Sequence, residues 1–191
     1  PMNRPATLLV LLLAGLLAGC GGGSRPTGIR AAETPADDVA EYQPRWRSHT
    51  VDSTQYRKVF LAGTIDMGRS SDWQAALVAR FRDSIGGRWL FFNPRRREFH
   101  ASPAEMEYQV AWELAHLEAA DLIVMNLLGD SRSPISLLEM GLYARSGKLF
   151  VACSPDYYRY DNVRITCRRY GVPLYDSLTA LLDDLPQQSD E

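Results

Sequence analysis

The chain has 191 residues, a formal net charge of -2 and 46% hydrophobic residues, which is enough for one ordinary domain core. The charge gives no basic field, so we expect no nucleic-acid partner. Part of the hydrophobic fraction lies at the N-terminus, where the apolar segment 6–17 follows Arg4. This pattern is typical of a signal peptide, and the segment is too short to span a bilayer comfortably.

The apolar segment ends in Leu17-Ala18-Gly19-Cys20, and small residues ahead of a cysteine at this place resemble a bacterial lipobox. The resemblance implies a lipoprotein signal peptide over residues 1–19, cleavage before Cys20 and lipidation of that cysteine. An ordinary anchor helix with a chance cysteine is the alternative. We expect a membrane-anchored lipoprotein on the periplasmic side, and Gly21 in place of an Asp favours the outer membrane if the source is Gram-negative.

Residues 20–55 are rich in Gly, Ser, Thr, Pro and charged side chains and show almost no apolar periodicity. This composition predicts a flexible tether that follows the lipidated cysteine, although Trp46 could dock on the domain. We expect the domain over residues 56–185, a polar tail over 186–191, and independent folding of the domain without the tether.

Short apolar segments alternate with helical patterns along the expected domain. The strands are predicted at 58–62, 88–92, 122–128, 149–153 and 172–175, and the helices at 73–85, 103–120, 134–146, 162–170 and 177–185. This alternation predicts an α/β fold with a single doubly wound, five-stranded parallel sheet of the flavodoxin or Rossmann-like type. The expected strand order is 2-1-3-4-5, with helices on both faces. The second helix is expected to bury Val110, Leu114 and Leu117.

The cysteine and histidine positions bear on metal and disulfide chemistry. Cys153 and Cys167 lie in a predicted strand and a predicted helix; an exported chain could oxidise them, but we favour two buried thiols. Glu113 and His116 form a single Glu-x-x-His, whereas a di-metal carboxylate site needs two such pairs. We therefore expect no metal site and no cofactor.

The segment 119–144 predicts a strand, a loop and a helix, with Ser133 as N-cap and Pro134 at the first helical position. In a parallel sheet, ligands bind beyond the carboxyl ends of the strands, where the loops after the first and third strands face each other. Glu139 interrupts the apolar pattern of this helix. It is either a buried carboxylate that needs a partner or a function, or an exposed one favoured by the helix dipole; the pattern leaves both open.

Several of these motifs, taken in order, resemble the nucleoside 2-deoxyribosyltransferase superfamily, closest to its deoxyribosyltransferase-like branch, over about residues 59–175. The motifs are Gly63-Thr64-Ile65-Asp66, Asp72-Trp73, Asn93-Pro94-Arg95-Arg96, Trp112-Glu113-Leu114, Ala120-Asp121 and Ser133-Pro134-Ile135-Ser136-Leu137-Leu138-Glu139-Met140-Gly141. The resemblance implies that Glu139 is the nucleophile that attacks C1′ of a nucleoside, and that Glu113 assists the leaving base or orients the nucleophile. Glu113 stands where the family carries an Asp.

The same resemblance implies a substrate-binding set. It comprises Gly63, Thr64, Ile65, Asp66, Asn93, Pro94, Arg95, Ser133 and Pro134. Phosphate-preferring relatives carry Arg in the first loop, where this chain has Asp66, and a carboxylate beside a phosphate is unfavourable. We therefore expect a nucleoside-like ligand rather than a 5′-monophosphate, unless the Arg95–Arg97 cluster turns toward it; three adjacent arginines more often form a solvated face.

The resemblance implies an N-glycosyl transferase or hydrolase, and in the family a neighbouring subunit often completes the site, so a homo-oligomer is expected. Two alternatives stay open. One is a non-enzymatic, lipid-anchored module that binds a nucleoside-like ligand or a protein. The other is a glycohydrolase for a nucleotide-derived metabolite such as NAD. Both enzymatic interpretations require Glu139 and Glu113 to converge in one place.

Overall fold

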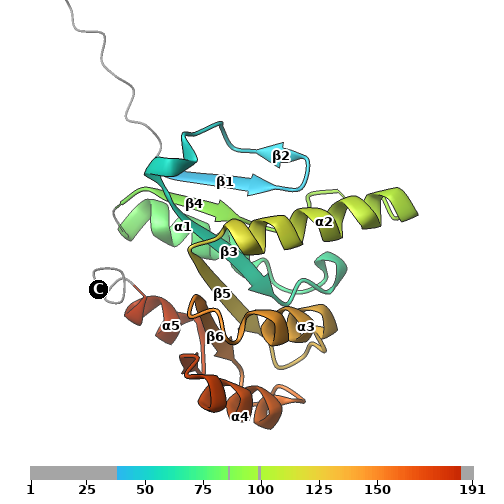
Figure 1. Cartoon of the computed structure of the whole chain (residues 1–191), viewed down its shortest axis with the longest axis vertical. Helices are drawn as coiled ribbons and strands as arrows, with labels where there is room; N and C mark the ends of the chain where they lie inside the picture. Colours follow the sequence, from blue (N-terminus) through green and yellow to red (C-terminus); the bar gives the residue numbers. More distant parts are fainter. Residues whose placement is uncertain (1–37, 86, 99, 186–191) are drawn as a thin grey trace, which may run out of the picture. The chain divides into compact units, whose positions relative to one another are not determined.

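A computed structural model describes residues 38–85, 87–98 and 100–185 (Figure 1). Its helices are α1 Trp73–Ser84, α2 Pro103–Ala119, α3 Pro134–Tyr143, α4 Tyr160–Tyr170 and α5 Leu178–Asp184. Its strands are β1 Val39–Gln43, β2 Trp46–Arg47, β3 Arg57–Gly63, β4 Trp89–Phe92, β5 Leu122–Leu127, β6 Leu149–Cys153 and β7 Leu174–Tyr175. The predicted signal peptide 1–19, Cys20, the first part of the tether and the tail 186–191 lie outside the described residues.

The strands form one sheet in the order β2-β1-β4-β3-β5-β6-β7. Every neighbouring pair is parallel except β1 and β2, which pair antiparallel. The run β4-β3-β5-β6-β7 is the predicted 2-1-3-4-5 order, since the five predicted strands are β3, β4, β5, β6 and β7. The doubly wound core of the sheet therefore follows from the alternation of apolar segments and helices.

The predicted count of five strands is wrong, because the sheet has seven. Both additional strands come from residues 39–47, which the sequence analysis placed in the tether. β1 pairs with β4 from Val39 opposite Trp89 to Tyr42 opposite Phe92. Since Val39, Ala40 and Tyr42 are buried in the core, this segment is part of the fold rather than a spacer.

Helices cover both faces of the sheet, as predicted. Leu117 of α2, Met140 of α3 and Cys167 of α4 pack in the hydrophobic core on one face. Phe81 of α1 and Leu181 of α5 pack in the core on the other face. Figure 1 shows α2 and α3 lying side by side across the same face. The two thiols, Cys153 and Cys167, are free and buried, as favoured from the sequence.

The prediction for the buried face of α2 is right for Leu117 and wrong for two residues. Val110 and Leu114 are each 45% exposed, whereas Leu117 is fully buried. Val110 lies in the N-terminal half of α2, which extends past the ends of the strands (Figure 1), so its side chain has no sheet beneath it. This position does not explain the exposure of Leu114, which lies in the C-terminal half. Among the described residues, no helix combines the length and the apolar character that crossing a membrane requires.

Candidate functional site

The switch point of this sheet lies between β3 and β5, because the chain leaves β3 toward β4 on one side and returns to β5 on the other. The loops that follow β3 and β5 therefore meet at the carboxyl edge of the sheet. Thr64 joins them directly: its backbone N–H donates to the carbonyl of Asn126 at 2.9 Å, and its Oγ1 accepts from the N–H of Leu128 at 3.1 Å. This is the edge where the candidate site residues were predicted.

Gly63 ends β3 at this edge with a φ of 122°, a conformation that L side chains rarely adopt. A Cβ at this position would lie 2.2 Å from the carbonyl oxygen of Asn126. The glycine thus allows β3 and β5 to approach closely where their loops diverge. Asp66 and Met67 follow in the next turn with φ values of 48° and 54°, which are strained for residues other than glycine.

The side chain of Arg95 bonds to several groups of the loop after β3. Its guanidinium donates to the carbonyls of Gly68 at 3.1 Å and Ser70 at 2.8 Å, and it lies 3.6 Å from a carboxylate oxygen of Asp72. The Arg95 side chain is only 11% exposed. The guanidinium of Arg95 is thus bound to groups of the protein, and Arg95 shapes the loop after β3.

The other two arginines of the cluster also contact groups of the protein. Arg96 forms an ion pair with Glu105 at 2.6 Å. The guanidinium of Arg97 stacks over the ring of Trp46, 4.0 Å from its centroid. The cluster therefore ties the loop after β4 to α2 and to β2.

Asn93 and Pro94, both predicted to bind substrate, also have partners inside the protein. The Asn93 amide donates to Glu41 at 2.7 Å, and its carbonyl accepts from the N–H of Arg95 at 3.0 Å. The carbonyl of Pro94 accepts from the amide of Gln109 in α2 at 3.0 Å. These bonds fix the carboxyl end of β4 against β1 and α2.

Glu139 lies on the buried face of α3, together with Ser136, Met140 and Tyr143. Its side chain is 8% exposed, which decides against the interpretation of a solvated glutamate. Among the described residues, no hydrogen bond or ion pair reaches its carboxylate. Burial, followed by the charge of Glu113, raises the pKa of Glu139 to about 8.

Glu113 approaches the same place from α2. The Gln109 amide donates to its carboxylate at 2.8 Å and also holds Pro94, so the orientation of Glu113 is tied to the loop after β4. Burial raises the pKa of Glu113, and the hydrogen bond from Gln109 opposes this only in part. The charge of Glu113 contributes to the raised pKa of Glu139, which indicates that the two carboxylates are near enough to interact between α2 and α3.

His116 takes no part in this pair. Its ring stacks on Trp112 at a centroid distance of 4.0 Å and meets Phe92 edge-on at 4.5 Å. Within the part of the chain that the structure describes, no three side chains of His, Cys, Asp or Glu gather as a metal site. A pocket of about 250 Å³ lies at the opposite, amino edge of the sheet and is lined by residues such as His49, Asp52 and Arg88.

Ser133 precedes α3, as predicted, but its side chain does not cap the helix. Its backbone is left-handed, with a φ of 41°, and its hydroxyl bonds to Thr64 and to Ser131 instead. Ser131 also bonds to Asp66. The sequence analysis missed Ser131, whose only signal was its place in the turn two residues before Ser133.

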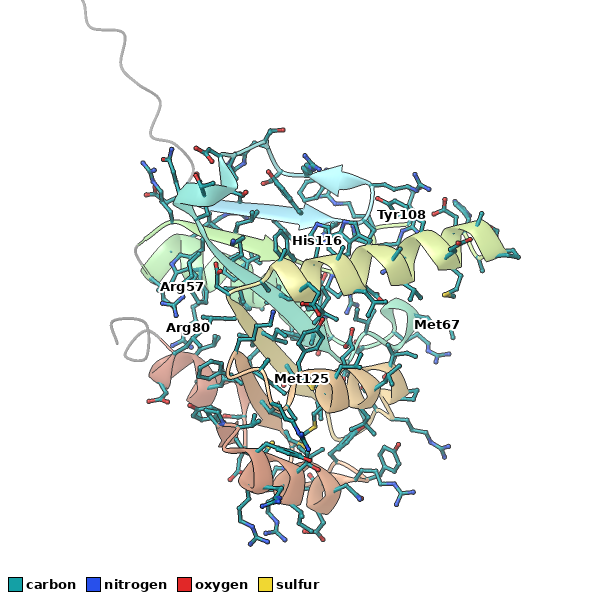
Figure 2. All side chains as sticks on the ribbon, viewed as in Figure 1. Arg57, Met67, Arg80, Tyr108, His116 and Met125 are labelled. Carbon is teal, nitrogen blue, oxygen red and sulfur yellow. The ribbon has the colours of Figure 1, made fainter. Side chains whose placement is uncertain are left out.

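The two helices that carry Glu113 and Glu139 also expose apolar side chains to solvent. Met106, Val110 and Leu114 form one exposed stripe along α2, and Ile135, Leu138 and Leu142 form another along α3. Met67, at the tip of the loop after β3, is 90% exposed. Figure 2 shows Met67 on the loop that lies between the free ends of α2 and α3.

Comparisons with known proteins give the family and the fold of the chain. Residues 56–157 match the family described as nucleoside 2-deoxyribosyltransferase like. A crystal structure of a conserved protein from Enterococcus faecalis V583 has the same fold, with a TM-score of 0.51 and 15% identity. The similarity covers 70% of this chain and 99% of that protein. No curated protein matches the chain.

Proposed function

Because the chain belongs to the nucleoside 2-deoxyribosyltransferase-like family, we propose that it cleaves the N-glycosidic bond of a nucleoside-like substrate, with Glu139 as nucleophile. One observation carries this proposal: Glu139 is buried, receives no hydrogen bond from the described residues and faces a second carboxylate. A carboxylate in such surroundings is costly to the fold, and a catalytic role is one reason to retain it.

The proposed chemistry is that of a retaining glycosidase. A carboxylate oxygen of Glu139 bonds to C1′ while the C1′–N bond breaks, and the electron pair of that bond leaves with the base. The proton of Glu113 passes to the base nitrogen, which leaves Glu113 ionised. In the second half, an acceptor base or a water molecule bonds to C1′, its proton passes to Glu113, and the ester bond to Glu139 breaks.

Burial raises the pKa of both carboxyl groups, that of Glu139 to about 8, so the pKa values do not decide which group is the acid. Their contacts differ: Gln109 donates to Glu113, whereas Glu139 has no hydrogen bond from the described residues that would weaken it as a nucleophile. We assign the nucleophile to Glu139 from the family resemblance and this difference, and the acid to Glu113; as a nucleophile Glu139 must act in its ionised form.

The engagement of the arginines supports a nucleoside rather than a nucleoside 5′-monophosphate. Arg95 and Arg96 are bound to carbonyl and carboxylate groups of the protein, and Arg97 lies on Trp46. None of the three offers its charge to a phosphate group at the loop after β3. That loop instead carries the carboxylate of Asp66, which would repel a phosphate.

Incubation of the protein with a panel of 2′-deoxynucleosides, with and without an acceptor base, followed by chromatography, tests the proposal. A released base or a new nucleoside is expected. A 2-fluoro-sugar nucleoside should leave a covalent adduct on Glu139 that mass spectrometry locates. Release of the base without formation of a new nucleoside, even when an acceptor base is present, would define a hydrolase. Formation of a new nucleoside with the acceptor base would define a transferase.

A binding module is the second candidate, because the exposed stripes on α2 and α3 offer an interaction surface. Saturable binding of nucleosides without any turnover would favour it and contradict the enzymatic proposal. If turnover occurs only with NAD, the substrate class is instead that of a nucleotide glycohydrolase.

We also propose a homo-oligomer, because the two stripes flank the glutamates and would be buried by a second copy of the chain. Sedimentation analysis should show a dimer or larger assembly for the wild type. The Leu138→Glu variant should be a monomer. Anchoring through Cys20 remains a proposal from the sequence. Cys20→Ser should abolish lipid attachment in intact-mass analysis and release the protein from the membrane fraction.

A further inference from the structure

Three polar side chains follow one another along one face of α2, and we name them the polar row. They are Glu105, Gln109 and Glu113, which are spaced four residues apart in the helix. Glu105 pairs with Arg96 in the loop after β4 at 2.6 Å. The amide of Gln109 donates to the carbonyl of Pro94 in the same loop at 3.0 Å. Among the described residues, Gln109 is also the hydrogen-bond donor to Glu113, at 2.8 Å.

The partners of Gln109 fix the orientation of its amide group. The carbonyl of Pro94 can only accept, so the amide nitrogen Nε2, rather than the amide oxygen, must face it. Nε2 also donates to Oε1 of Glu113. An amide nitrogen carries two hydrogens, and these two bonds use both of them. The remaining polar atom of the side chain is its oxygen, Oε1.

The amide oxygen of Gln109 is buried and, within the part of the chain that the structure describes, receives no hydrogen bond. Burying an acceptor without a donor is costly, so this atom needs a proton from a neighbouring group. Of the two groups that contact the amide, the carbonyl of Pro94 has no proton to give. Glu113 has one when its carboxyl group is protonated, because a carboxylic acid carries an O–H group.

A second glutamine shows why the number of donors matters. Gln43 Oε1 is also buried without a hydrogen bond from the described residues, and its amide donates to Glu41 at 3.0 Å. Glu41, however, accepts a further bond from Asn93 at 2.7 Å, and two N–H donors suit an ionised carboxylate. Glu113 has one N–H donor, and no cation of the described residues pairs with it. Of the two glutamates, Glu113 therefore has the contacts that favour a protonated carboxyl group.

The charged groups around Glu113 agree with a neutral carboxyl group at this place. Arg96 of the loop after β4 pairs with Glu105, and burial lowers the pKa of His116 on α2, so that ring is neutral near neutral pH. On α3, the pKa of Glu139 is raised by burial and then by the charge of Glu113. A proton on Glu113 removes that charge. Glu139 then ionises more readily, as a nucleophile must.

We propose that Gln109 is a positioning residue that places a proton on Glu113: its N–H donates to Oε1 of the Glu113 carboxyl group, and its amide oxygen accepts the O–H of Oε2. This inference rests on the proposed function, because Glu113 is the proposed acid of that reaction. Gln109 thereby determines which of the two carboxyl groups is the acid and leaves Glu139 ionised.

The same proton then serves the reaction. When the C1′–N bond breaks, the base nitrogen replaces the amide oxygen of Gln109 as acceptor of the O–H of Glu113. The electron pair of the broken C1′–N bond forms the new N–H bond, and the electron pair of the O–H bond stays on Glu113. The N–H of Gln109 remains bonded to the resulting carboxylate, which holds Glu113 in place for the second half of the reaction.

Carbon NMR of protein labelled isotopically at the glutamate carboxyl carbons tests where the proton lies. In a Glu139→Gln background, Glu113 is the carboxyl group of the pair that still titrates, and Glu113→Gln identifies its signal. Gln109→Met keeps the length of the side chain but has neither amide atom, and it should make Glu113 titrate at lower pH. A role as N–H donor alone predicts the opposite sign, because that bond lowers the pKa of Glu113.

The matched control is Gln43→Met, at the glutamine of β1 that also donates to a glutamate, and it should leave the titration of Glu113 unchanged. If Gln109→Met does not fold, Gln109→Asn replaces it. Asparagine keeps an amide but is one methylene shorter, so it cannot bind Pro94 and Glu113 as glutamine does, and the same shift to lower pH is expected.

Turnover gives a second measurement. Cleavage of 2′-deoxyguanosine needs a proton on the leaving base, whereas the base of 7-methyl-2′-deoxyguanosine is already positively charged and leaves without one. Gln109→Met should lower kcat for 2′-deoxyguanosine about tenfold near neutral pH and leave kcat for the methylated nucleoside nearly unchanged. An equal loss for both substrates would indicate a purely structural role for Gln109 and would overturn the inference.

The outcomes separate the two proposals. Titration of Glu113 at the same or a higher pH in Gln109→Met overturns this inference and leaves the proposed function intact. Titration at lower pH, together with selective loss of 2′-deoxyguanosine cleavage, supports both. If the titration shifts to lower pH but the unsubstituted protein turns over neither nucleoside, the proposed function fails for these nucleosides, while the placement of the proton by Gln109 stands.

Discussion

Two glutamates with nearly the same burial have opposite surroundings. Glu41 in β1 is 9% exposed, and its carboxylate accepts from Asn93 at 2.7 Å and from Gln43 at 3.0 Å. Glu139 in α3 is 8% exposed and faces Glu113 without a hydrogen bond from the described residues. Burial alone therefore does not mark a catalytic carboxylate. The informative feature is that Glu139 is as buried as Glu41 but has no hydrogen bond from the described residues to offset the cost of burying its carboxylate.

The largest effect is expected from removing the edge of the sheet that contains Glu41, which is formed by β1 and β2. Deletion of residues 1–55 should abolish cooperative thermal unfolding, because it exposes β4 and removes the buried residues Val39, Ala40 and Tyr42. Deletion of residues 1–37 is the matched control and isolates the contribution of 38–55. A shortened protein with an unchanged Tm would show that the domain folds from residue 56, as the sequence alone suggested.

Substitution of Glu139 should affect activity more than stability. Glu139→Ala is expected to lower kcat by at least about a thousandfold, since it removes the nucleophile, while the circular dichroism spectrum is retained. Glu107→Ala, at an exposed glutamate of α2, is the control and should keep full activity. Undiminished turnover by Glu139→Ala would end the proposed mechanism.

Because no hydrogen bond from the described residues offsets the burial of Glu139, the stability of the protein should depend on pH. The pKa of Glu139 is about 8 in the folded protein, above its ordinary value of 4.5, so the folded state binds the proton more tightly. The contribution to stability is complete below about pH 4.5 and is lost as the pH rises through 8. Glu139→Gln should therefore be increasingly more stable than the wild type from pH 5 to pH 9, by up to a few kcal/mol. Urea unfolding of both proteins at pH 5 and pH 9 measures the difference in unfolding free energy. A difference that is the same at both pH values would contradict the prediction.

A smaller effect is expected at Glu41. Glu41→Ala leaves the buried amide of Asn93 without its acceptor and should cost about 2 kcal/mol of unfolding free energy. Glu41→Gln keeps an acceptor oxygen and should cost less. Equal losses in the two variants would show that the charge of Glu41, rather than its hydrogen bonds, stabilises the edge of the sheet.

The strands of the central sheet could be predicted because each is a short, continuous apolar run bounded by turn residues. β1 could not, because Glu41 and Gln43 interrupt its apolar residues and a charged segment precedes it. The charge of Glu41 is acceptable there because Gln43 and, far away in sequence, Asn93 donate to it. A local pattern contains Gln43 but not Asn93.

The same limit applies to the site. Spacing placed Val110 and Leu114 on one face of α2 with Leu117, but it could not reveal that these two side chains are exposed while Leu117 is buried. The family resemblance singled out Glu113 and Glu139 and required them to converge. Ser131 could not be found, because it gains its meaning from Asp66, 65 residues earlier in the chain.

The glycine at the end of β3 sets a limit on how this sequence can vary. A Cβ at Gly63 would collide with the backbone of Asn126, and the φ of 122° disfavours any other residue. Gly68, five residues later, also has positive φ, but a Cβ there meets nothing within 4 Å. In a saturation library sorted for folded protein, position 63 should return glycine alone, whereas position 68 should also return asparagine and aspartate.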